Sequence, residues 1–366
     1  MDSYTVKAGD SLAGIAMKLF GNANKWREIA DINSIADPTK IKIGQVLQLP
    51  PTQGTVSGVD LVEITTEGKK VFYRLQGTTD KIFLGNLFRL GLSRMGNFNT
   101  ERFIINNSAL LDDLKLSRSE ISTLLATSQN EGNLDAINTY DNQFLSFGMF
   151  QWTLGGDNGK GELAALLKVS KNTQPASFQK FFGSLGVDVS ADTNDVSGFL
   201  ILNGNKMDTA AKKAVFRSNE WALNFALAGK EPTLCAAQIL HAVNRFNRFY
   251  FTALPNFDGL SISDMLSSEY AASLLLDQHV NRPSHVAPVV AEALKQTGIT
   301  AHQLAAGTDA DELKVINKYL SIRETFGNPA MTDSGRRAQV VKTFLDQGKI
   351  SAKKASFKSN RQLRSQ

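Results

Sequence analysis

The first fifty residues contain a complete pattern of small secondary-structure elements, and this pattern constrains the fold more than any other feature of the chain. Residues 4–7 alternate as a short strand does, and we expect Asp10 to cap the N-terminus of a following helix. That helix carries apolar side chains at helical spacing, namely Leu12, Ile15, Ala16 and Leu19. A second helix is expected around Trp26, and residues 43–50 return as a strand after a turn at Gly44. The order strand, helix, helix, strand predicts a compact two-layer domain.

The residues of this N-terminal pattern resemble the LysM family across its whole length. The matching positions are Tyr4 to Leu12, Ile15, Ala16, Phe20, Gly21, Trp26, Asn33, 43–47 and Pro50. The resemblance implies that the domain binds glycans containing N-acetylglucosamine, such as peptidoglycan, in a shallow groove. The residues implied for the groove are Gly9, Asp10, Ser11 and Leu12, with Ile32 and Asn33 opposite. Two alternatives stay open: Asp10 and Trp26 only cap and pack, or the domain is scaffolding of the kind found in phage tails and contractile injection machines.

The rest of the chain is expected to be mainly helical. After a linker at 50–58, residues 60–65 and 70–75 predict the two strands of a hairpin. Apolar stripes of helical period recur further on, at 208–228, 233–252, 264–279, 286–297 and 309–324. We therefore expect an α+β protein with four parts: a βααβ domain at 1–50, a linker and hairpin at 51–80, a larger helical domain at 81–345 and a basic tail at 346–366.

Composition and charge narrow the possible partners. The single cysteine, Cys235, excludes an intramolecular disulfide framework. We expect no membrane span, because the chain has no run of about 18 apolar residues. The N-terminus also lacks the basic and apolar regions of a secretory signal peptide. The formal charge is +5, but basic residues without acidic ones gather at 349–366, so the folded body is close to neutral and nucleic-acid binding is not expected. The tail suggests either a tether to an anionic surface or a solvated terminus.

A candidate catalytic carboxyl group lies at the end of one predicted helix. Ser117 and Glu120 have the spacing of a capping box, so the helix starts near residue 118. Its apolar stripe continues to Glu131, which stands just before Gly132, a residue typical of helix ends. Apolar neighbours and the negative helix terminus would both disfavour the charged form of this carboxyl group. A carboxyl group that stays protonated near neutral pH can donate its proton to a leaving oxygen.

The segment after Glu131 is expected to form a β-hairpin that returns polar groups toward the helix end. Turn-forming residues occupy 138–143 and residues typical of strands occupy 144–152. Glycoside cleavage needs a protonated carboxyl group and a second group that positions water or stabilises the cationic sugar. Asp141 could be that second group, with Asp135 as the alternative. Ser146 and Gln151 could also face the helix end.

Residues 121–153 resemble the lysozyme-like superfamily, which includes phage-type lysozymes, lytic transglycosylases and chitosanases. The matching residues are Glu131-Gly132, Asp141 and Ser146 followed by Gly148. Transglycosylases instead carry serine after the glutamate, where Gly132 stands here. The resemblance implies Glu131 as general acid and Asp141 with Ser146 as the groups that guide water. Four further residues, Tyr140, Gly148, Gln151 and Trp152, are candidates for contacts with substrate; the alternative for the aromatic ones is core packing.

Other classes of chemistry find no support. The four histidines and Cys235 have no metal-ligand spacing, and no phosphate-binding glycine motif occurs, so we expect neither metal nor cofactor. Polar stretches at 240–250 and 276–283 could satisfy buried helix ends or line the far wall of a cleft. The sequence therefore predicts a muramidase-type peptidoglycan hydrolase or lytic transglycosylase, whose reaction could invert, retain or end in an anhydro product. The alternatives are a non-catalytic component of a phage tail or injection system, and a chitosanase or chitinase. Without a signal peptide, we expect a virion or an injection system to deliver the protein to the cell wall.

Overall fold

A computed structural model describes residues 3–20, 26–49, 61–328 and 331–360. The chain divides into two compact units. The first consists of Met1–Glu63 with Arg74–Thr79, and the second of Ile64–Tyr73 with Asp80–Gln366. The linker expected at 50–58 lies outside the described residues.

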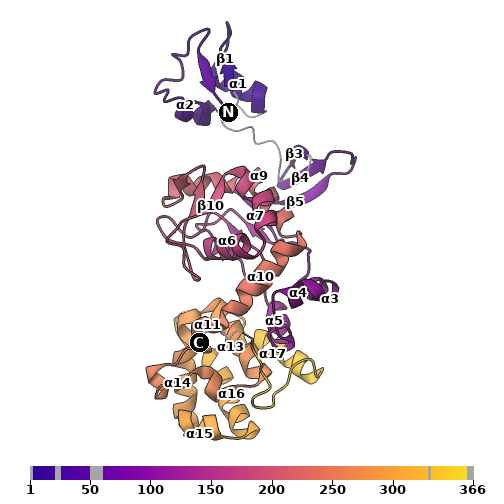
Figure 1. The fold of residues 1–366 in the computed structure, drawn as a ribbon, viewed down its shortest axis with the longest axis vertical. Helices are drawn as coiled ribbons and strands as arrows, with labels where there is room; N and C mark the ends of the chain where they lie inside the picture. The colour runs from indigo at the N-terminus through magenta and orange to yellow at the C-terminus, as the bar shows by residue number, and fades with distance from the viewer. Residues whose placement is uncertain (1–2, 21–25, 50–60, 329–330, 361–366) are drawn as a thin grey trace. The chain divides into compact units, whose positions relative to one another are not determined.

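The first unit contains the four elements expected from the sequence. These are β1 (Ser3–Thr5), α1 (Leu12–Phe20), α2 (Trp26–Ile32) and β2 (Val46–Gln48), and β1 pairs antiparallel with β2 (Figure 1). A small apolar core contains residues of both helices, one residue of β2 and the residue just after β1. Its members are Val6, Leu12, Ile15, Ala16, Ile29, Ala30 and Leu47. Trp26 packs against this core and is only partly buried. The βααβ prediction is confirmed.

The cap of α1 differs from the prediction. The hydroxyl group of Ser11, and not the Asp10 carboxylate, accepts a hydrogen bond from the backbone N–H of Gly14, at 3.1 Å. The Asp10 carboxylate instead accepts from the Lys7 N–H and from the Tyr4 hydroxyl, both at 2.8 Å. The helix therefore begins one residue later than expected, and Asp10 stabilises the turn that precedes it.

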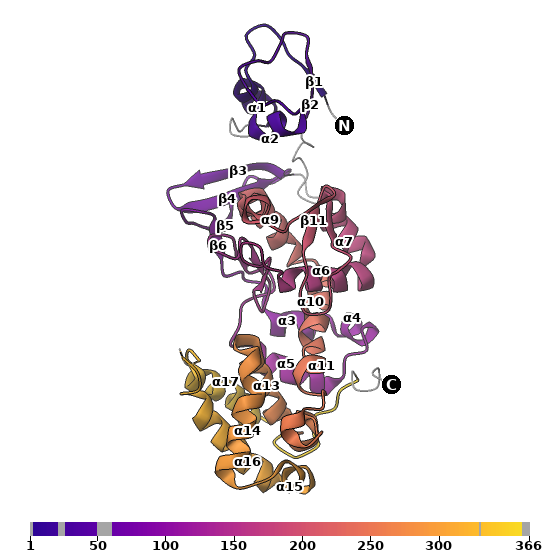
Figure 2. The same cartoon turned by 90° about the vertical axis from the view of Figure 1, so that its left-hand side faces the viewer.

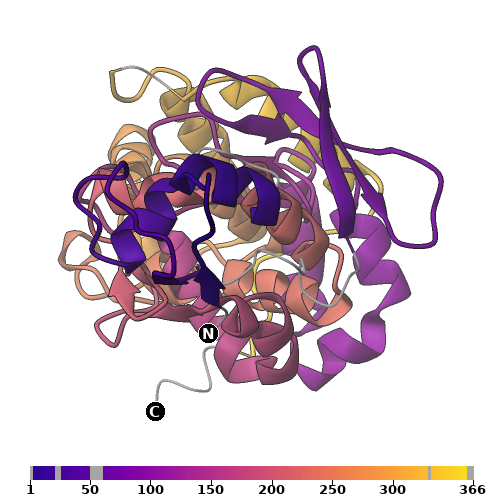
Figure 3. The ribbon, with the colours of Figure 1, turned by 90° about the horizontal axis from the view of Figure 1, so that it is seen from above.

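The larger sheet has the strand order β3-β4-β5-β6-β7-β8-β9. Its strands are β3 (Leu61–Glu67), β4 (Lys70–Leu75), β5 (Ile82–Leu87), β6 (Leu92–Arg94), β7 (Ile137–Asn138), β8 (Ser146–Phe147) and β9 (Trp152–Thr153). The first two form the expected hairpin, drawn as the long purple arrows in Figure 3, with Gly68 at a positive φ of 60° in its turn. A second sheet, β10-β11-β12, comprises Val187–Val189, Leu200–Leu202 and Asn205–Lys206.

Helices make up most of the second unit (Figures 1 and 2). The α-helices are α3 (Thr100–Asn106), α4 (Ser108–Asp113), α5 (Arg118–Ser128), α6 (Glu162–Thr173), α7 (Pro175–Phe181), α8 (Ala210–Lys213), α9 (Asn219–Ala228), α10 (Pro232–Asn244), α11 (Phe246–Phe249), α12 (Ile262–Met265), α13 (Glu269–Asn281), α14 (Val286–Thr297), α15 (Ala301–Ala306), α16 (Asp309–Arg323) and α17 (Ser334–Asp346). Short 3₁₀ helices lie at Gly183–Leu185, Ala214–Arg217, Pro255–Phe257 and Pro283–His285.

Two of these helices, α10 and α13, form the centre of the unit. Their side chains are buried on nearly every side, as expected of helices enclosed by others. The first packs against α6 and α5, and the second packs against α5 and α17. Helix α5, which leads to Glu131, is therefore held from both sides. The α+β fold class is confirmed.

The basic segment near the C-terminus packs onto the second unit as far as residue 360. Phe357 is buried against Phe246 and Tyr250, with ring centroids 4.8 and 5.4 Å away. The Lys354 ammonium group donates to the backbone oxygens of Met265 and Leu304 at 2.9 and 2.8 Å. Residues 351–360 of the expected tail therefore form a segment that is packed on the second unit, which we call the strap. Residues 361–366 of the expected tail lie outside the described residues.

Candidate active site

Glu131 lies just beyond the C-terminus of α5. The capping box predicted from Ser117 and Glu120 is present and starts this helix. The helix ends at Ser128, three residues earlier than the predicted end, and a turn joins the Glu131 N–H to the Ser128 carbonyl at 3.1 Å. The next N–H, that of Gly132, donates to the Met149 carbonyl between β8 and β9 at 2.9 Å. The loop between these strands thus fixes the backbone on which the candidate acid stands.

One oxygen of the Glu131 carboxyl group is engaged by two donors. Its Oε1 atom accepts a hydrogen bond from the Arg337 guanidinium group of α17, which is also an ion pair. The amide of Asn281, at the end of α13, donates to the same atom at 3.3 Å. Within the described residues, the other oxygen, Oε2, has no hydrogen-bond partner. The Glu131 side chain is 15% exposed, so solvent and ligands can reach part of it.

Behind Glu131 lies a buried network of charges. Asp277 of α13 accepts from Arg337 at 2.7 Å and from Arg323 of α16 at 3.2 Å, and both Asp277 and Arg323 are fully buried. Asn130 donates to Asp277 at 3.2 Å and to the Arg337 carbonyl at 3.0 Å. Because Asp277 is held by two arginines, its carboxylate is not available to a substrate. The network fixes Arg337 and, through it, Glu131.

The protonation of Glu131 depends on two opposing effects. Burial raises the pKa of this carboxyl group, while the charge and hydrogen bond of Arg337 act to lower it. Burial has the larger effect, and the pKa lies above its ordinary value. The direction agrees with the one expected from the sequence. The opposing arginine was not anticipated, because no local pattern links residue 131 to residue 337.

Asp141 and Ser146 lie on the β7–β8 hairpin. The Asp141 carboxylate accepts from the Asn138 amide and from the Gln143 N–H, both at 2.8 Å, so it stabilises its own turn. Ser146 is buried in β8, where it pairs with Asn138 and Thr153. Among the described residues, no hydrogen bond joins either side chain to Glu131.

The candidate substrate contacts have different surroundings. Gly148 has a positive φ of 77°, and a side chain there would meet the Gln238 amide oxygen at 2.2 Å. Gln151 donates to the Gly148 carbonyl at 2.9 Å. Trp152 is buried and its ring contacts those of Phe150 and His241. Tyr140 alone among these residues is exposed at the surface. We therefore leave Gly148 and Trp152 out of the surface considered for sugar binding.

Asp135, the alternative to Asp141, is fully buried in a different network. It pairs with Arg94 at 2.7 Å and accepts from the N–H groups of Asn97 and Phe98, both at 2.8 Å. Its neighbour Asn133 donates to the carbonyls of Met95 and Gly96 at 3.2 and 3.1 Å. These bonds join the chain just after Glu131 to the segment that follows β6.

A second charged cluster surrounds Glu162 at the start of α6. Its carboxylate pairs with His241 at 3.1 Å, with Arg248 at 2.7 Å and with Arg245. Although burial alone would raise it, the His241 hydrogen bond and the arginine charges lower the pKa of Glu162 to about 2. Burial lowers the pKa of Arg245, while the charges of Glu162 and Glu131 act in the opposite direction. The polar stretch at 240–250 thus supplies the partners of the half-buried Glu162 carboxylate. The stretch at 276–283 contributes Asp277 and Asn281 to the surroundings of Glu131.

The expected glycan-binding residues of the first unit lie in two segments. Gly9 and Ser11 are exposed, Asp10 is half-buried and Leu12 belongs to the core. Ile32 is exposed at the end of α2. The Asn33 amide donates to the Gln48 carbonyl and accepts from the Gln48 N–H, both at 2.7 Å, so it ties α2 to β2.

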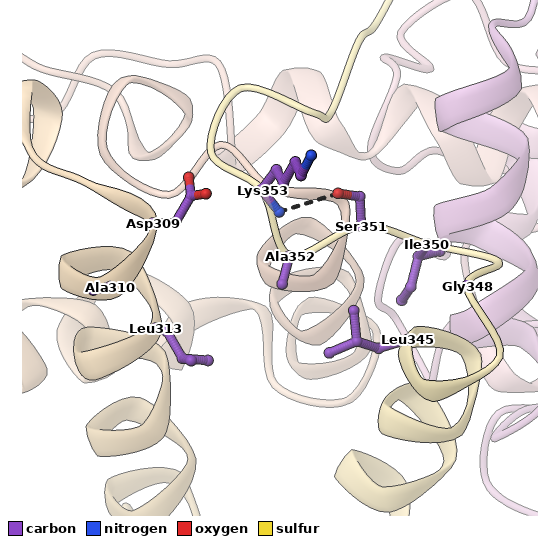
Figure 4. Close-up of a pocket in the computed structure, with 9 residues that line it drawn as sticks. All are labelled: Asp309, Ala310, Leu313, Leu345, Gly348, Ile350, Ser351, Ala352 and Lys353. Carbon is purple, nitrogen blue, oxygen red and sulfur yellow. Dashed lines mark hydrogen bonds between the residues drawn. The ribbon is translucent and has the colours of Figure 1, made fainter.

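A pocket of about 520 Å³ lies away from these residues. It is a mostly apolar hollow between the start of α16 and the end of α17, lined by Asp309, Ala310, Leu313, Leu345, Gly348, Ile350, Ser351, Ala352 and Lys353 (Figure 4). Figure 4 also shows the Lys353 N–H donating to the Ser351 hydroxyl, at 3.1 Å. None of the predicted site residues lines this pocket.

The described residues contain no group of three or more side chains arranged to hold a metal ion. Among the helices that these residues form, none combines the length and the apolarity that crossing a bilayer would require.

Comparison with known proteins identifies the first unit. Residues 4–50 match the LysM domain. A potassium binding protein, Kbp, of Escherichia coli is 45% identical over 49 residues, 13% of this chain and 33% of that protein. The esterase Rv1288 of Mycobacterium tuberculosis is 36% identical over 70 residues, 19% of this chain and 15% of the esterase. A LysM domain-containing GPI-anchored protein of Arabidopsis thaliana is 38% identical over 61 residues, 16% of this chain and 17% of that protein. The chain thus spans a third or less of each relative.

Proposed function

We propose that this protein, whose residues 4–50 form a LysM domain, binds the glycan strands of peptidoglycan and cleaves them with Glu131 as general acid. A LysM domain implies binding of peptidoglycan or chitin, which both contain N-acetylglucosamine. The bond proposed for cleavage joins N-acetylmuramic acid to N-acetylglucosamine. The proposal places the second unit in the lysozyme-like superfamily, on the resemblance of residues 121–153.

One observation carries the catalytic part: a half-buried carboxyl group with a raised pKa and one unoccupied oxygen. Burial favours the protonated form of Glu131. Arg337 and Asn281 hold Oε1, which leaves Oε2 as the atom that can carry and donate the proton. A general acid must be protonated and must present that proton to the leaving oxygen. Burial favours the protonated form that a general acid requires, and Oε2 is the carboxyl oxygen that Arg337 and Asn281 leave free to donate.

The proposed reaction begins with proton transfer from Glu131 Oε2 to the glycosidic oxygen. The bond from that oxygen to the sugar C1 breaks, a water oxygen attacks C1, and one proton of that water passes to the Asp141 carboxylate. Asp141 is proposed to guide this water, with Ser146 beside it on the same hairpin. The Asp141 carboxylate would have to accept from water in addition to Asn138 and Gln143, and its four lone-pair positions permit that.

Loss of turbidity of purified sacculi tests the proposal. We expect wild type to lyse them and Glu131→Gln to be slower by about 10²–10⁴-fold, the usual contribution of a general acid. Glu101→Gln is the matched control, because Glu101 is a glutamate on α3 that pairs only at the surface with Lys349. Equal lysis by wild type and Glu131→Gln would remove Glu131 from the mechanism. Mass analysis of the fragments would separate peptidoglycan cleavage from cleavage of chitin or chitosan.

The Arg337 ion pair favours a second candidate function. Glu131 could serve only as an ion-pair partner of Arg337 in the buried network with Asp277 and Arg323. The second unit would then bind glycan without cleaving it. In that case wild type and Glu131→Gln would both leave sacculi intact, and Glu131→Gln would lower thermal stability. A non-catalytic wall-binding or tail component would then be the better description.

A further inference from the structure

Exposed aromatic side chains gather where β5, β6 and β7 meet their connecting turns. Phe83, Phe88 and Tyr140 are 39%, 47% and 37% exposed, although such residues are usually more buried. Leu90 and Met95 are exposed beside them in the chain. We call Phe83, Phe88, Met95 and Tyr140 the aromatic surface. All four belong to the second unit.

The backbone around the aromatic surface is fixed. The Phe88 and Tyr140 rings stack with centroids 4.3 Å apart and planes 23° apart. The Phe88 N–H donates to the Gly91 carbonyl at 2.7 Å, which closes the turn between β5 and β6. Next to Tyr140, the Thr139 N–H donates to the Leu92 carbonyl at 2.8 Å. The two rings are therefore held together before any ligand arrives, which reduces the entropy cost of binding.

Polar groups accompany the rings. A pocket of about 260 Å³ is lined by Phe83, Asn86, Phe88, Ser93, Arg94, Met95, Gly96 and Asn97. Its amide and hydroxyl side chains can exchange hydrogen bonds with neutral groups. Arg94 is the one charged residue of this lining, and its charge is neutralised by Asp135 at 2.7 Å. The pocket thus suits an uncharged ligand and lacks the free cations that a nucleic acid or an acidic peptide would require.

The aromatic surface is connected to the candidate acid. Met95 and Gly96, at the rim of the pocket, accept hydrogen bonds from Asn133, which stands two residues after Glu131. Asn133 thus links the backbone just after Glu131 to the lining of the pocket. A linear glycan suits this lining, because its rings offer apolar C–H faces for aromatic stacking and hydroxyl and acetamido groups for amides.

We infer that the aromatic surface and its pocket form a sugar-binding subsite, which holds one N-acetylhexosamine ring of the strand at a distance from the cleaved bond. The inference rests on the proposed function for the identity of the strand. It adds to that function a set of specificity residues, Phe83, Phe88 and Asn97, that the sequence did not single out. Binding at this subsite would position the strand, and these residues would not take part in bond cleavage.

Hydrogen-exchange mass spectrometry on the full chain can locate the subsite. The probe is chitohexaose, added to Glu131→Gln so that it is not cleaved. We expect slower exchange at residues 86–97 and 138–142, besides any protection within the LysM domain. In Glu131→Gln with Phe88→Ala and Tyr140→Ala, the sugar concentration for half-maximal protection should rise about tenfold, from the loss of two aromatic contacts. Protection confined to residues 4–50, or equal protection in the aromatic variant, would overturn the inference.

Two control variants separate stacking from damage to the fold. Tyr140→Phe keeps the ring and should therefore keep the protection. A loss of protection in this variant would mean that the Tyr140 hydroxyl group, and not ring stacking, binds the sugar. Leu313→Ala removes an exposed apolar side chain on α16, 43% exposed, and should change nothing. If wild type self-associates in analytical ultracentrifugation and the aromatic variant does not, the surface is an interface between copies and the inference is wrong. Because binding is measured without cleavage, failure of the proposed hydrolysis would leave this result unaffected.

Discussion

The protonation of Glu131 depends on the balance between burial and its polar neighbours, of which Arg337 has the largest effect. Arg337 lowers the pKa of that group by its charge and its hydrogen bond, and burial raises it further than Arg337 lowers it. Arg337 also pairs with Asp277, whose negative charge raises the pKa of Glu131. A general acid loses activity as pH rises through its pKa, because the deprotonated form has no proton to give. The pH range of activity should therefore depend on Arg337.

Replacing Arg337 tests this dependence. In Arg337→Gln the opposing charge is gone, so the pKa of Glu131 should rise further and the alkaline limb of the rate profile should move to higher pH. Arg337→Lys should keep most of the original profile. The measurement is the initial rate of sacculus lysis against pH, with Arg336→Gln as control, because Arg336 is exposed on the same helix and pairs with Asp333. A limb that stays in place would mean that another group limits the rate.

At the scale of single residues, the sequence was informative only where the deciding contact is local. Glu131 was identifiable from a capping box and a following glycine. Its partner Arg337 stands 206 residues later, and no pattern of spacing connects the two. The cap of α1 shows a subtler error: Asp10 and Ser11 are both good capping residues, and the choice depends on which one the Lys7 turn already uses.

Among the secondary-structure elements, periodicity predicted long helices well and missed their interruptions. The stripe at 286–297 coincides with α14, and that at 309–324 with α16. The stripe at 208–228 is broken, because the Ser218 hydroxyl accepts from the Trp221 N–H and caps a new helix there. The stripe at 233–252 is likewise divided near Arg245, where the chain passes from α10 to α11. Apolar spacing continues through such breaks, so the pattern alone does not show them.

A buried lysine on α8 holds the glycine-rich loop that follows β9. The Lys213 ammonium group is fully buried and donates to the carbonyls of Gly155, Gly156 and Gly159, at 3.1, 2.6 and 2.6 Å. In Lys213→Met these carbonyls would lose their donor, so we expect the free energy of unfolding to fall by roughly 2–4 kcal/mol. Urea denaturation measures this change.

The adjacent lysine supplies the comparison for this variant. Lys212 is exposed and pairs with Asp208 one turn away, so Lys212→Met should change stability by no more than about 0.5 kcal/mol. Equal effects of the two substitutions would show that the loop does not depend on Lys213.

Over the whole molecule, we expect the LysM domain to bind the polymer and the larger unit to cleave it. Every residue of the LysM core lies between Val6 and Leu47, so removing residues 1–50 takes no core residue from the second unit. Tethering one site to a polymer raises the local concentration of the polymer at the other. The shortened protein should therefore sediment less with sacculi and still cleave soluble fragments at a similar rate. Unchanged sedimentation would mean that the LysM domain does not hold the wall.

The strap at residues 351–360 has a consequence for how the protein is made. The Ser117 hydroxyl donates to the Lys358 carbonyl at 2.6 Å, and the Lys358 N–H donates to the Ser119 hydroxyl at 3.0 Å. The first turn of α5 therefore gains these partners only after some 240 further residues have left the ribosome. During synthesis α5, the helix that leads to Glu131, lacks these hydrogen bonds until residue 358 has been added, and a nascent chain that stops before the strap would lack both of them.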